Sequence, residues 1–136
     1  MMQKPLFNRI ALIGLGLLGS SLAHALKRDG LVNHVAGTAR SKPTRDKALE
    51  IGFIDSAHET PAEAVIDADV VVLCSPVGTY GDVARAMRPG LKDGVIITDV
   101  GSVKAAVIRD VLPELPGSAH LVPAIRLRAP RIRGRN

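Results

Sequence analysis

The chain has 136 residues, 46% of them hydrophobic and 23% charged, and a formal net charge of +5. This size and balance exclude a disordered or collagen-like chain and leave room for one domain with a substantial core. The one cysteine, Cys74, excludes an internal disulfide framework, and the histidines show no metal-binding spacing. Two phenylalanines and one tyrosine are too few for a platform that stacks single-stranded nucleic acid.

The excess positive charge lies at the end of the chain. The other lysines and arginines equal the 13 acidic residues in number, so the body of the chain is neutral overall. This distribution favours a solvated or aberrant tail over a nucleic-acid-binding arm, and we expect no nucleic-acid partner. The arginines of the tail are Arg126, Arg128, Arg131, Arg133 and Arg135.

Short apolar runs alternate with helical periodicity along the chain. The run at 10–13 indicates a strand buried on both faces, and 17–28 follows as a helix with Leu18 on its apolar face. The next expected elements, in chain order, are strand 34–38, helix 43–51, strand 53–54, helix 61–67, strand 69–75, helix 80–87, strand 95–100, helix 104–112 and strand 120–122. This alternation predicts an α/β fold with a mainly parallel sheet over residues 1–123.

The start of the chain also has features of a secretory signal. Lys4 and Arg9 precede an apolar run, and Ala23-His24-Ala25 resembles a cleavage site. Against this, the run is too short to span a membrane as a helix and contains glycines at a meaningful spacing. We therefore expect a cytoplasmic protein with no membrane partner.

A glycine-rich segment, G-x-G-x-x-G, joins the first expected strand to the first expected helix. Gly14 permits the tight turn, Gly16 leaves room for a pyrophosphate against the backbone, and Gly19 allows close contact between helix and strand. Free amides and the positive dipole end at the helix start then bind the phosphates. The alternative is a buried turn without a ligand. The segment predicts a Rossmann-type doubly wound sheet with a dinucleotide site that also includes Leu15, Leu17 and Leu18.

The end of the second expected strand indicates which dinucleotide is preferred. An NAD site places an acidic residue there to bind the ribose, but the stretch 37–42 contains none. Arg40 and Lys42 are suited to pair with a 2′-phosphate and Ser41 to donate to it, with Thr38 nearby. NADP is therefore favoured and NAD remains possible, because these are also ordinary loop charges and an arginine stacked on adenine accepts either cofactor.

Two later strand ends carry small and polar residues. The backbone of the loop 74–79, with Ser75, Pro76 and Val77, is expected beside the ribose and nicotinamide of the cofactor, since ligands bind at the carboxyl ends of the strands. Asp99 and Ser102 belong to the second polar rim, where Asp99 is expected to contact the cofactor and Ser102 to face the substrate. Ser102 is also suited to cap the following helix. Lys104 faces either the site or solvent. Cys74 is interpreted as a small buried hydrophobic residue, since no histidine partner is evident.

Four segments together point to a family: I-A-L-I-G-L-G-L-L-G-S-S-L-A (10–23), S-P-V-G (75–78), T-D-V-G-S-V-K (98–104) and H-L-V-P-A (120–124). Over residues 8–124 the chain resembles the N-terminal half of the prephenate/arogenate (cyclohexadienyl) dehydrogenases. T-D-V-G-S-V-K is the most specific of the four, because many dehydrogenases share the glycine motif.

The resemblance implies oxidative decarboxylation of prephenate or arogenate in tyrosine biosynthesis. It implies that Ser102 is catalytic, close to the substrate hydroxyl and to a histidine in an H-P-I-A-G-T-E segment. A helical C-terminal domain of the family supplies the dimer contact and much of the substrate site. Here Ala124 is followed by Ile125-Arg126-Leu127-Arg128 with no histidine, and we expect that domain to be absent. We therefore expect the chain to bind the cofactor and to turn over little substrate by itself.

Two alternatives stay open. The chain could be another small-substrate NADP-dependent dehydrogenase or reductase, with a different catalytic residue after the fifth strand. It could also be a nucleotide-sensing module without chemistry, whose tail contacts a partner.

The arginine-rich tail has a specific explanation. GC-rich codons for A-H-P-I-A-G-T-E-D-S-G-P-E can be chosen so that loss of the first base of the histidine codon gives A-I-R-L-R-A-P-R-I-R-G-R-N, the sequence of residues 124–136. Shifted GC-rich codons often read CGN, which encodes arginine. We hypothesise that this tail is a frameshift product or a sequencing error.

This hypothesis predicts the DNA sequence. Inserting one base after the codon for Ala124 should restore H-P-I-A-G-T-E in the new frame, which resequencing of the gene will test. If no single insertion restores that segment, the hypothesis is wrong.

Overall fold

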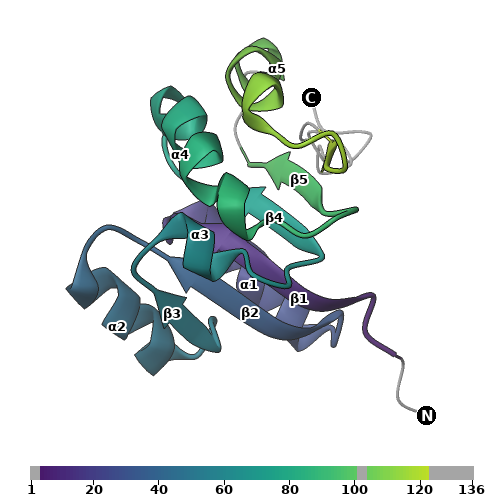
Figure 1. Ribbon diagram of the computed structural model, residues 1–136. Coiled ribbons are helices and arrows are strands. Elements are labelled where there is room, and N and C mark those ends of the chain that lie inside the picture. Colours follow the sequence, from purple (N-terminus) through teal and green to yellow (C-terminus); the bar gives the residue numbers. More distant parts are fainter. Residues whose placement is uncertain (1–3, 101–103, 123–136) are drawn as a thin grey trace, which may run out of the picture.

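The computed structural model describes residues 4–100 and 104–122, shown in Figure 1. Six strands form one sheet of order β3-β2-β1-β4-β5-β6, and every neighbouring pair runs parallel. This is the doubly wound order, in which the chain moves outward in one direction and then restarts beside β1 in the other. The strands are β1 (Phe7–Ile13), β2 (Val32–Thr38), β3 (Ser56–His58), β4 (Val70–Leu73), β5 (Ile96–Asp99) and β6 (His120–Leu121).

Helices cover both faces of the sheet (Figure 1). Successive side chains of a strand point to opposite faces, so Ile10 and Leu12 of β1 join one hydrophobic cluster while Ala11 and Ile13 join the other. The first cluster includes residues of α1 and α2, and the second includes residues of α3, α4 and α5. The helices are α1 (Leu17–Arg28), α2 (Lys42–Ile51), α3 (Pro61–Ala64), α4 (Tyr80–Met87) and α5 (Lys104–Val111). In the described ranges no helix is both long and apolar enough to cross a membrane.

The expected order of elements is confirmed, with one strand misplaced. Phe53 and Ile54 are only 5% and 2% exposed, but they lie in the connection after α2 and not in a strand. These two residues are hydrophobic because they are buried against the sheet. Sequence periodicity alone cannot distinguish such a buried connection from a paired strand. The strand β3 begins later, at Ser56, after the Asp55 amide has donated to the Val35 carbonyl at 2.7 Å.

Two other local expectations were also wrong. Leu18 is 62% exposed, because the small residues Gly19 and Ala23 form the face of α1 that meets the sheet. The helix expected over 61–67 ends at Ala64, and Asp67 then adopts a positive φ of 62° in the turn that leads to β4.

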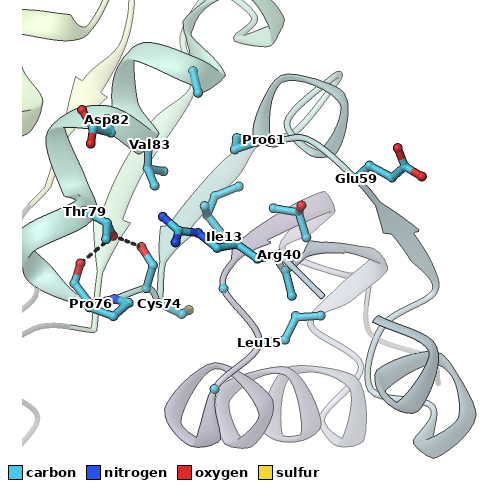
Figure 2. Close-up of a pocket in the computed structure, with 16 residues that line it drawn as sticks. Ile13, Leu15, Arg40, Glu59, Pro61, Cys74, Pro76, Thr79, Asp82 and Val83 are labelled. Atoms are coloured by element: carbon cyan, nitrogen blue, oxygen red, sulfur yellow. Dashed lines mark hydrogen bonds between the residues drawn. The ribbon is translucent and has the colours of Figure 1, made fainter. Parts of the chain in front are cut away.

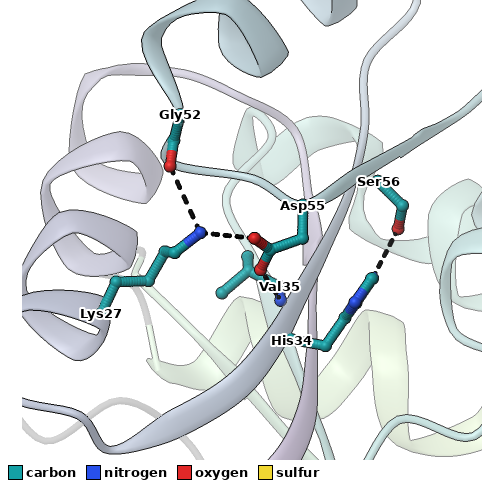
Figure 3. Close-up of polar contacts among 6 residues, drawn as sticks. All are labelled: Lys27, His34, Val35, Gly52, Asp55 and Ser56. Atoms are coloured by element: carbon teal, nitrogen blue, oxygen red, sulfur yellow. Dashed lines mark hydrogen bonds and ion pairs between the residues drawn. The ribbon is translucent and has the colours of Figure 1, made fainter.

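Two carboxylates accept hydrogen bonds from strand amides toward the amino-terminal edge of the sheet. Asp69 Oδ2 accepts hydrogen bonds from the amides of Asn8 (2.8 Å) and Arg9 (3.1 Å), and Lys92 pairs with the same carboxylate. Asp55 does the equivalent for β2 (Figure 3): it accepts from the Val35 amide at 2.8 Å and pairs with Lys27 at 2.6 Å.

The pKa values of these carboxyls show that the pairing outweighs burial. Burial opposes ionisation of Asp55, but Lys27 and the Val35 amide together hold its pKa below the ordinary range. For Asp69 the hydrogen bond from Lys92 is the largest cause of a lowered pKa. Both groups are therefore charged near neutral pH, and each charge is balanced by the neighbouring lysine.

A serine hydroxyl joins two histidines on the outer part of the sheet. Ser56 Oγ lies 2.8 Å from His34 Nε2, as Figure 3 shows, and 2.9 Å from His58 Nε2. Burial, and then the nearby Arg9 guanidinium, lower the pKa of both rings, although Asp55 and Glu63 act in the opposite direction. The folded protein therefore favours neutral imidazoles, which can share the hydroxyl as donor and acceptor.

This pair predicts loss of stability in mild acid. Because the folded-state pKa of each histidine lies below its ordinary value of 6.5, the unfolded chain binds protons more readily as the pH falls below 6.5. The neutral pair therefore contributes fully to the free energy of unfolding above pH 6.5, and this contribution is lost as the pH falls below it. Urea unfolding midpoints should fall between pH 7.5 and about pH 5, a range in which Asp55 and Asp69 stay ionised.

The His34→Gln/His58→Gln double variant is the matched control. It should show a smaller decline over the same range, because the titrating groups are gone. An equal decline in both proteins would contradict the assignment.

Candidate functional site

The carboxyl ends of β1, β2 and β4 surround a crevice of about 540 Å³ (Figure 2). It lies where the strand order reverses, between the connection that leaves β1 toward one face and the connection that leaves β4 toward the other. In open α/β sheets this is the position at which ligands bind.

Gly14 sits at the centre of the three strand ends. Its amide donates to the Thr38 carbonyl of β2 at 2.9 Å, and its φ of +99° disfavours any other residue. A Cβ at this position would lie 2.8 Å from the Ser75 nitrogen and 3.0 Å from the Cys74 carbonyl carbon, both backbone atoms. A glycine is therefore required both by conformation and by space.

The other two glycines of the motif have different surroundings. A Cβ on Gly19 would lie 3.0 Å from Cys74 Sγ and 3.3 Å from the Gly14 carbonyl oxygen, so Gly19 lets α1 approach the strand ends. A Cβ on Gly16 would meet no atom within 4 Å, since Gly16 lines the open crevice. Gly16 is also the N-cap of α1, where no side-chain cap is formed and the first turn carries no acidic residue.

This helix start is suited to an anion. The first amides of a helix have no partner within the helix, and the helix dipole adds a partial positive charge there. With no side-chain cap and no carboxylate in the first turn, the amides of α1 remain available to a phosphate.

The end of β2 brings one cation into the crevice. In Figure 2 the Arg40 guanidinium points into the hollow, and in the described part of the chain it has no ion pair. Ser41 and Lys42 have local uses: Ser41 Oγ caps α2 by accepting from the Thr44 amide at 3.2 Å, and Lys42 pairs with Asp46 at 2.8 Å. Of the three residues expected to bind a 2′-phosphate, Arg40 has the side chain directed into the crevice.

The turn after β4 forms the opposite wall. Thr79 Oγ1 donates to the Pro76 carbonyl at 2.6 Å and lies 3.0 Å from Ser75 Oγ, which holds this turn in shape (Figure 2). Val83 and Ala86, one turn apart on α4, supply apolar surface above it. This wall can contact a sugar through its polar atoms and a base through its apolar ones.

Cys74 lies between the motif glycines and the crevice. Burial, with a smaller effect of the Asp99 carboxylate, raises the pKa of its thiol to about 12. The thiol is therefore protonated at neutral pH and is a poor nucleophile. Its packing against the hydrophobic cluster that includes Ile10 and Leu12 supports the interpretation of Cys74 as a small hydrophobic residue.

The crevice contains about half of the residues expected there. Leu17 and Leu18 are exposed at the start of α1, and Asp99 is buried at the end of β5. Val77 begins a 3-10 turn after Pro76, and Ser102 lies outside the described residues. Those that line the crevice are Gly14, Leu15, Gly16, Thr38, Arg40, Ser75 and Pro76.

Several lining residues were missed by the sequence analysis. The spacing of Val83 and Ala86 on one face of a helix was a usable signal. Glu59 and Pro61 follow β3 and reach the crevice only because of the strand order, which no local pattern shows. The missed residues are Ile13, Ala39, Glu59, Pro61, Asp82, Val83 and Ala86.

A parallel sheet of this order, with a glycine turn at its switch point and an uncapped helix start, defines a Rossmann-type nucleotide-binding domain. The family model "Prephenate dehydrogenase, nucleotide-binding domain" matches residues 22–134. The chain belongs to this family.

Individual dehydrogenases of known sequence or structure are also similar to this chain. The chain is 44% identical over 116 residues to the cyclohexadienyl dehydrogenase of Zymomonas mobilis, covering 85% of this chain and 39% of that protein. Prephenate dehydrogenase of A. aeolicus, solved with hydroxyphenyl propionate and NAD+, superposes with a TM-score of 0.73 at 27% identity, covering 82% of this chain and 40% of that one. Synechocystis arogenate dehydrogenase gives 0.71 at 32% identity, with 78% and 37% covered. The chain thus spans about two-fifths of the length of these proteins.

The glycine geometry predicts contrasting effects of two alanine substitutions. Gly14→Ala should lower the free energy of unfolding by about 3 kcal/mol or more. An alanine there would be strained at a positive φ, and its Cβ would overlap the backbone of Cys74 and Ser75. Gly16→Ala should change it by less than about 1 kcal/mol, because its Cβ meets open space. Chemical unfolding of both variants tests this, and equal losses would contradict the geometry.

Proposed function

We propose that this chain is the NAD(P)-binding domain of a dehydrogenase that acts on prephenate or arogenate. The proposal rests on two features of the crevice at the switch point of the sheet. Gly14 packs against the backbone of Cys74 and Ser75, a close approach that we call the glycine corner, and α1 starts without a side-chain cap. Membership of the prephenate dehydrogenase family supports the choice of reaction.

The residues present fit a dinucleotide. The amides that follow Gly14 would bind the pyrophosphate, with Gly16 leaving the approach open. Arg40 and the apolar wall of Val83 and Ala86 would hold the adenosine end. Ser75 and Pro76 lie at the neighbouring strand end, on the side proposed for the nicotinamide.

NADP is proposed as the preferred cofactor, with NAD also accepted. The Arg40 guanidinium points into the crevice, and no acidic residue follows β2 to bind the ribose hydroxyls. A guanidinium pairs well with a phosphate dianion, whereas a carboxylate would repel it. Glu59 also lines the crevice, but it follows β3, and its side chain points away from the hollow in Figure 2.

The chemistry proposed for the whole enzyme is an oxidative decarboxylation. When bound, the cofactor would supply an oxidised nicotinamide as the acceptor for the hydride of the ring carbon that carries the substrate hydroxyl. The hydroxyl becomes a carbonyl as its proton passes to a base, and the ring carboxylate leaves as CO₂. The electron pair of the broken C–C bond makes the ring aromatic, and the resulting phenolate oxygen takes a proton back. By family resemblance Ser102 would hold the substrate hydroxyl. Such a biosynthetic step is proposed to take place in the cytoplasm.

Nucleotide titrations test the proposal. The chain should bind NADPH more tightly than NADH, measured by the fluorescence of the reduced cofactor. Arg40→Asp should reverse the preference, with NADPH affinity falling at least about tenfold from loss of one charge-assisted contact. NADP+ with prephenate should give little absorbance change, because no histidine follows Ala124.

The outcomes separate the parts of the proposal. A folded protein that binds neither nucleotide would overturn it. An unchanged NADPH to NADH ratio in Arg40→Asp would overturn only the cofactor preference, and Lys42→Asp serves as a nearby charge control.

A further inference from the structure

We propose that Arg45 is a positioning residue that sets the cofactor preference by holding Arg40 in place. This inference rests on the proposed function, because it concerns the part of the crevice that would receive the 2′-phosphate. Arg45 does not line the crevice, and it belongs to the first turns of α2.

The contacts of Arg45 are on both sides of Arg40. Its Nη1 donates to the Ala39 carbonyl at 2.7 Å and to the Arg40 carbonyl at 3.2 Å. These two oxygens belong to the two peptide planes that flank the Arg40 Cα. Because peptide planes are rigid, holding both of them fixes the backbone dihedrals of Arg40 and therefore the direction of its Cα–Cβ bond.

The other cations of α2 have different partners. Lys42 pairs with Asp46 at 2.8 Å and Lys47 lies 3.8 Å from Glu50, both along the exposed helix surface. Arg45 is half-buried and, among the described residues, its charge is directed to the two carbonyls and not to a carboxylate. It is thus the α2 side chain that folds back onto the turn after β2.

The start of α2 strengthens this arrangement. Ser41 Oγ accepts from the Thr44 amide and lies 2.8 Å from Thr44 Oγ1, so the N-cap residue next to Arg40 is also held. The Arg45 amide donates to the Ser41 carbonyl at 3.2 Å. The turn 39–41 is thereby fixed before any ligand is bound, and only the Arg40 side chain remains to be ordered.

The functional consequence is preorganisation. A loop already fixed in its bound conformation loses less conformational freedom when the ligand binds. Without Arg45, the backbone on either side of Arg40 would have to be ordered by the 2′-phosphate itself. The loss should therefore appear in NADPH affinity and not in NADH affinity.

The test is a double-mutant cycle on nucleotide binding, using Arg45→Met, Arg40→Ala and the combined variant. Arg45→Met should weaken NADPH binding about three- to tenfold, the cost of ordering one further flexible residue, and leave NADH affinity unchanged. In the Arg40→Ala background, Arg45→Met should have no further effect on NADPH, because it acts through Arg40.

Three controls complete the experiment. Arg45→Lys keeps a donor and should recover part of the NADPH affinity, and Lys47→Met should behave as wild type. Thermal unfolding of each variant separates loss of the fold from loss of selectivity.

Each other outcome overturns the inference. If Arg45→Met still weakens NADPH binding when Arg40 is alanine, then Arg45 contacts the phosphate directly. If Arg45→Met keeps the wild-type NADPH to NADH ratio, or weakens both nucleotides equally, Arg45 has no part in selectivity, while the proposed function stands. If the wild-type chain binds neither nucleotide, the proposed function fails and this inference fails with it.

Discussion

The lack of space around Gly14 is the constraint on which the rest of this structure depends. One residue without a side chain joins β1 to β2 through its amide and lies against the backbone that follows β4. Because Gly14 carries no Cβ, the ends of β1, β2 and β4 can approach one another closely. The helix α1 then begins directly after these strand ends. The position of the helix start, and hence of its free amides, follows from this corner.

The two edges of the sheet use charge in opposite ways. At the amino-terminal edge, Asp55 and Asp69 each accept from strand amides and pair with a lysine, so the charges there are already used. At the carboxyl edge, the start of α1 has no side-chain cap and Arg40 has no ion pair among the described residues. Among the described residues, the region suited to an anion at this edge coincides with the crevice.

Much of the fold could be predicted from the sequence, because the signals were local. The glycine spacing located the turn, and the apolar runs located the central strands. Phe53 and Ile54 were misassigned because an apolar pair indicates burial and not hydrogen bonding. Glu59 and Pro61 were missed because their position at the crevice depends on the strand order. Ser41 and Lys42 were expected in the site, but capping and an i,i+4 ion pair occupy them.

The most direct test of this account is an NMR titration of the labelled chain with NADPH, following each backbone amide. We expect the largest shifts at the amides of residues 15–18 at the start of α1, with smaller shifts at Arg40 and Ser75. A smaller hollow of about 380 Å³ lies between α1 and α2, lined by Thr44, Lys47 and Ile51 among others. Shifts confined to that hollow, with the start of α1 unchanged, would contradict the claim that the glycine corner presents its helix amides to a pyrophosphate.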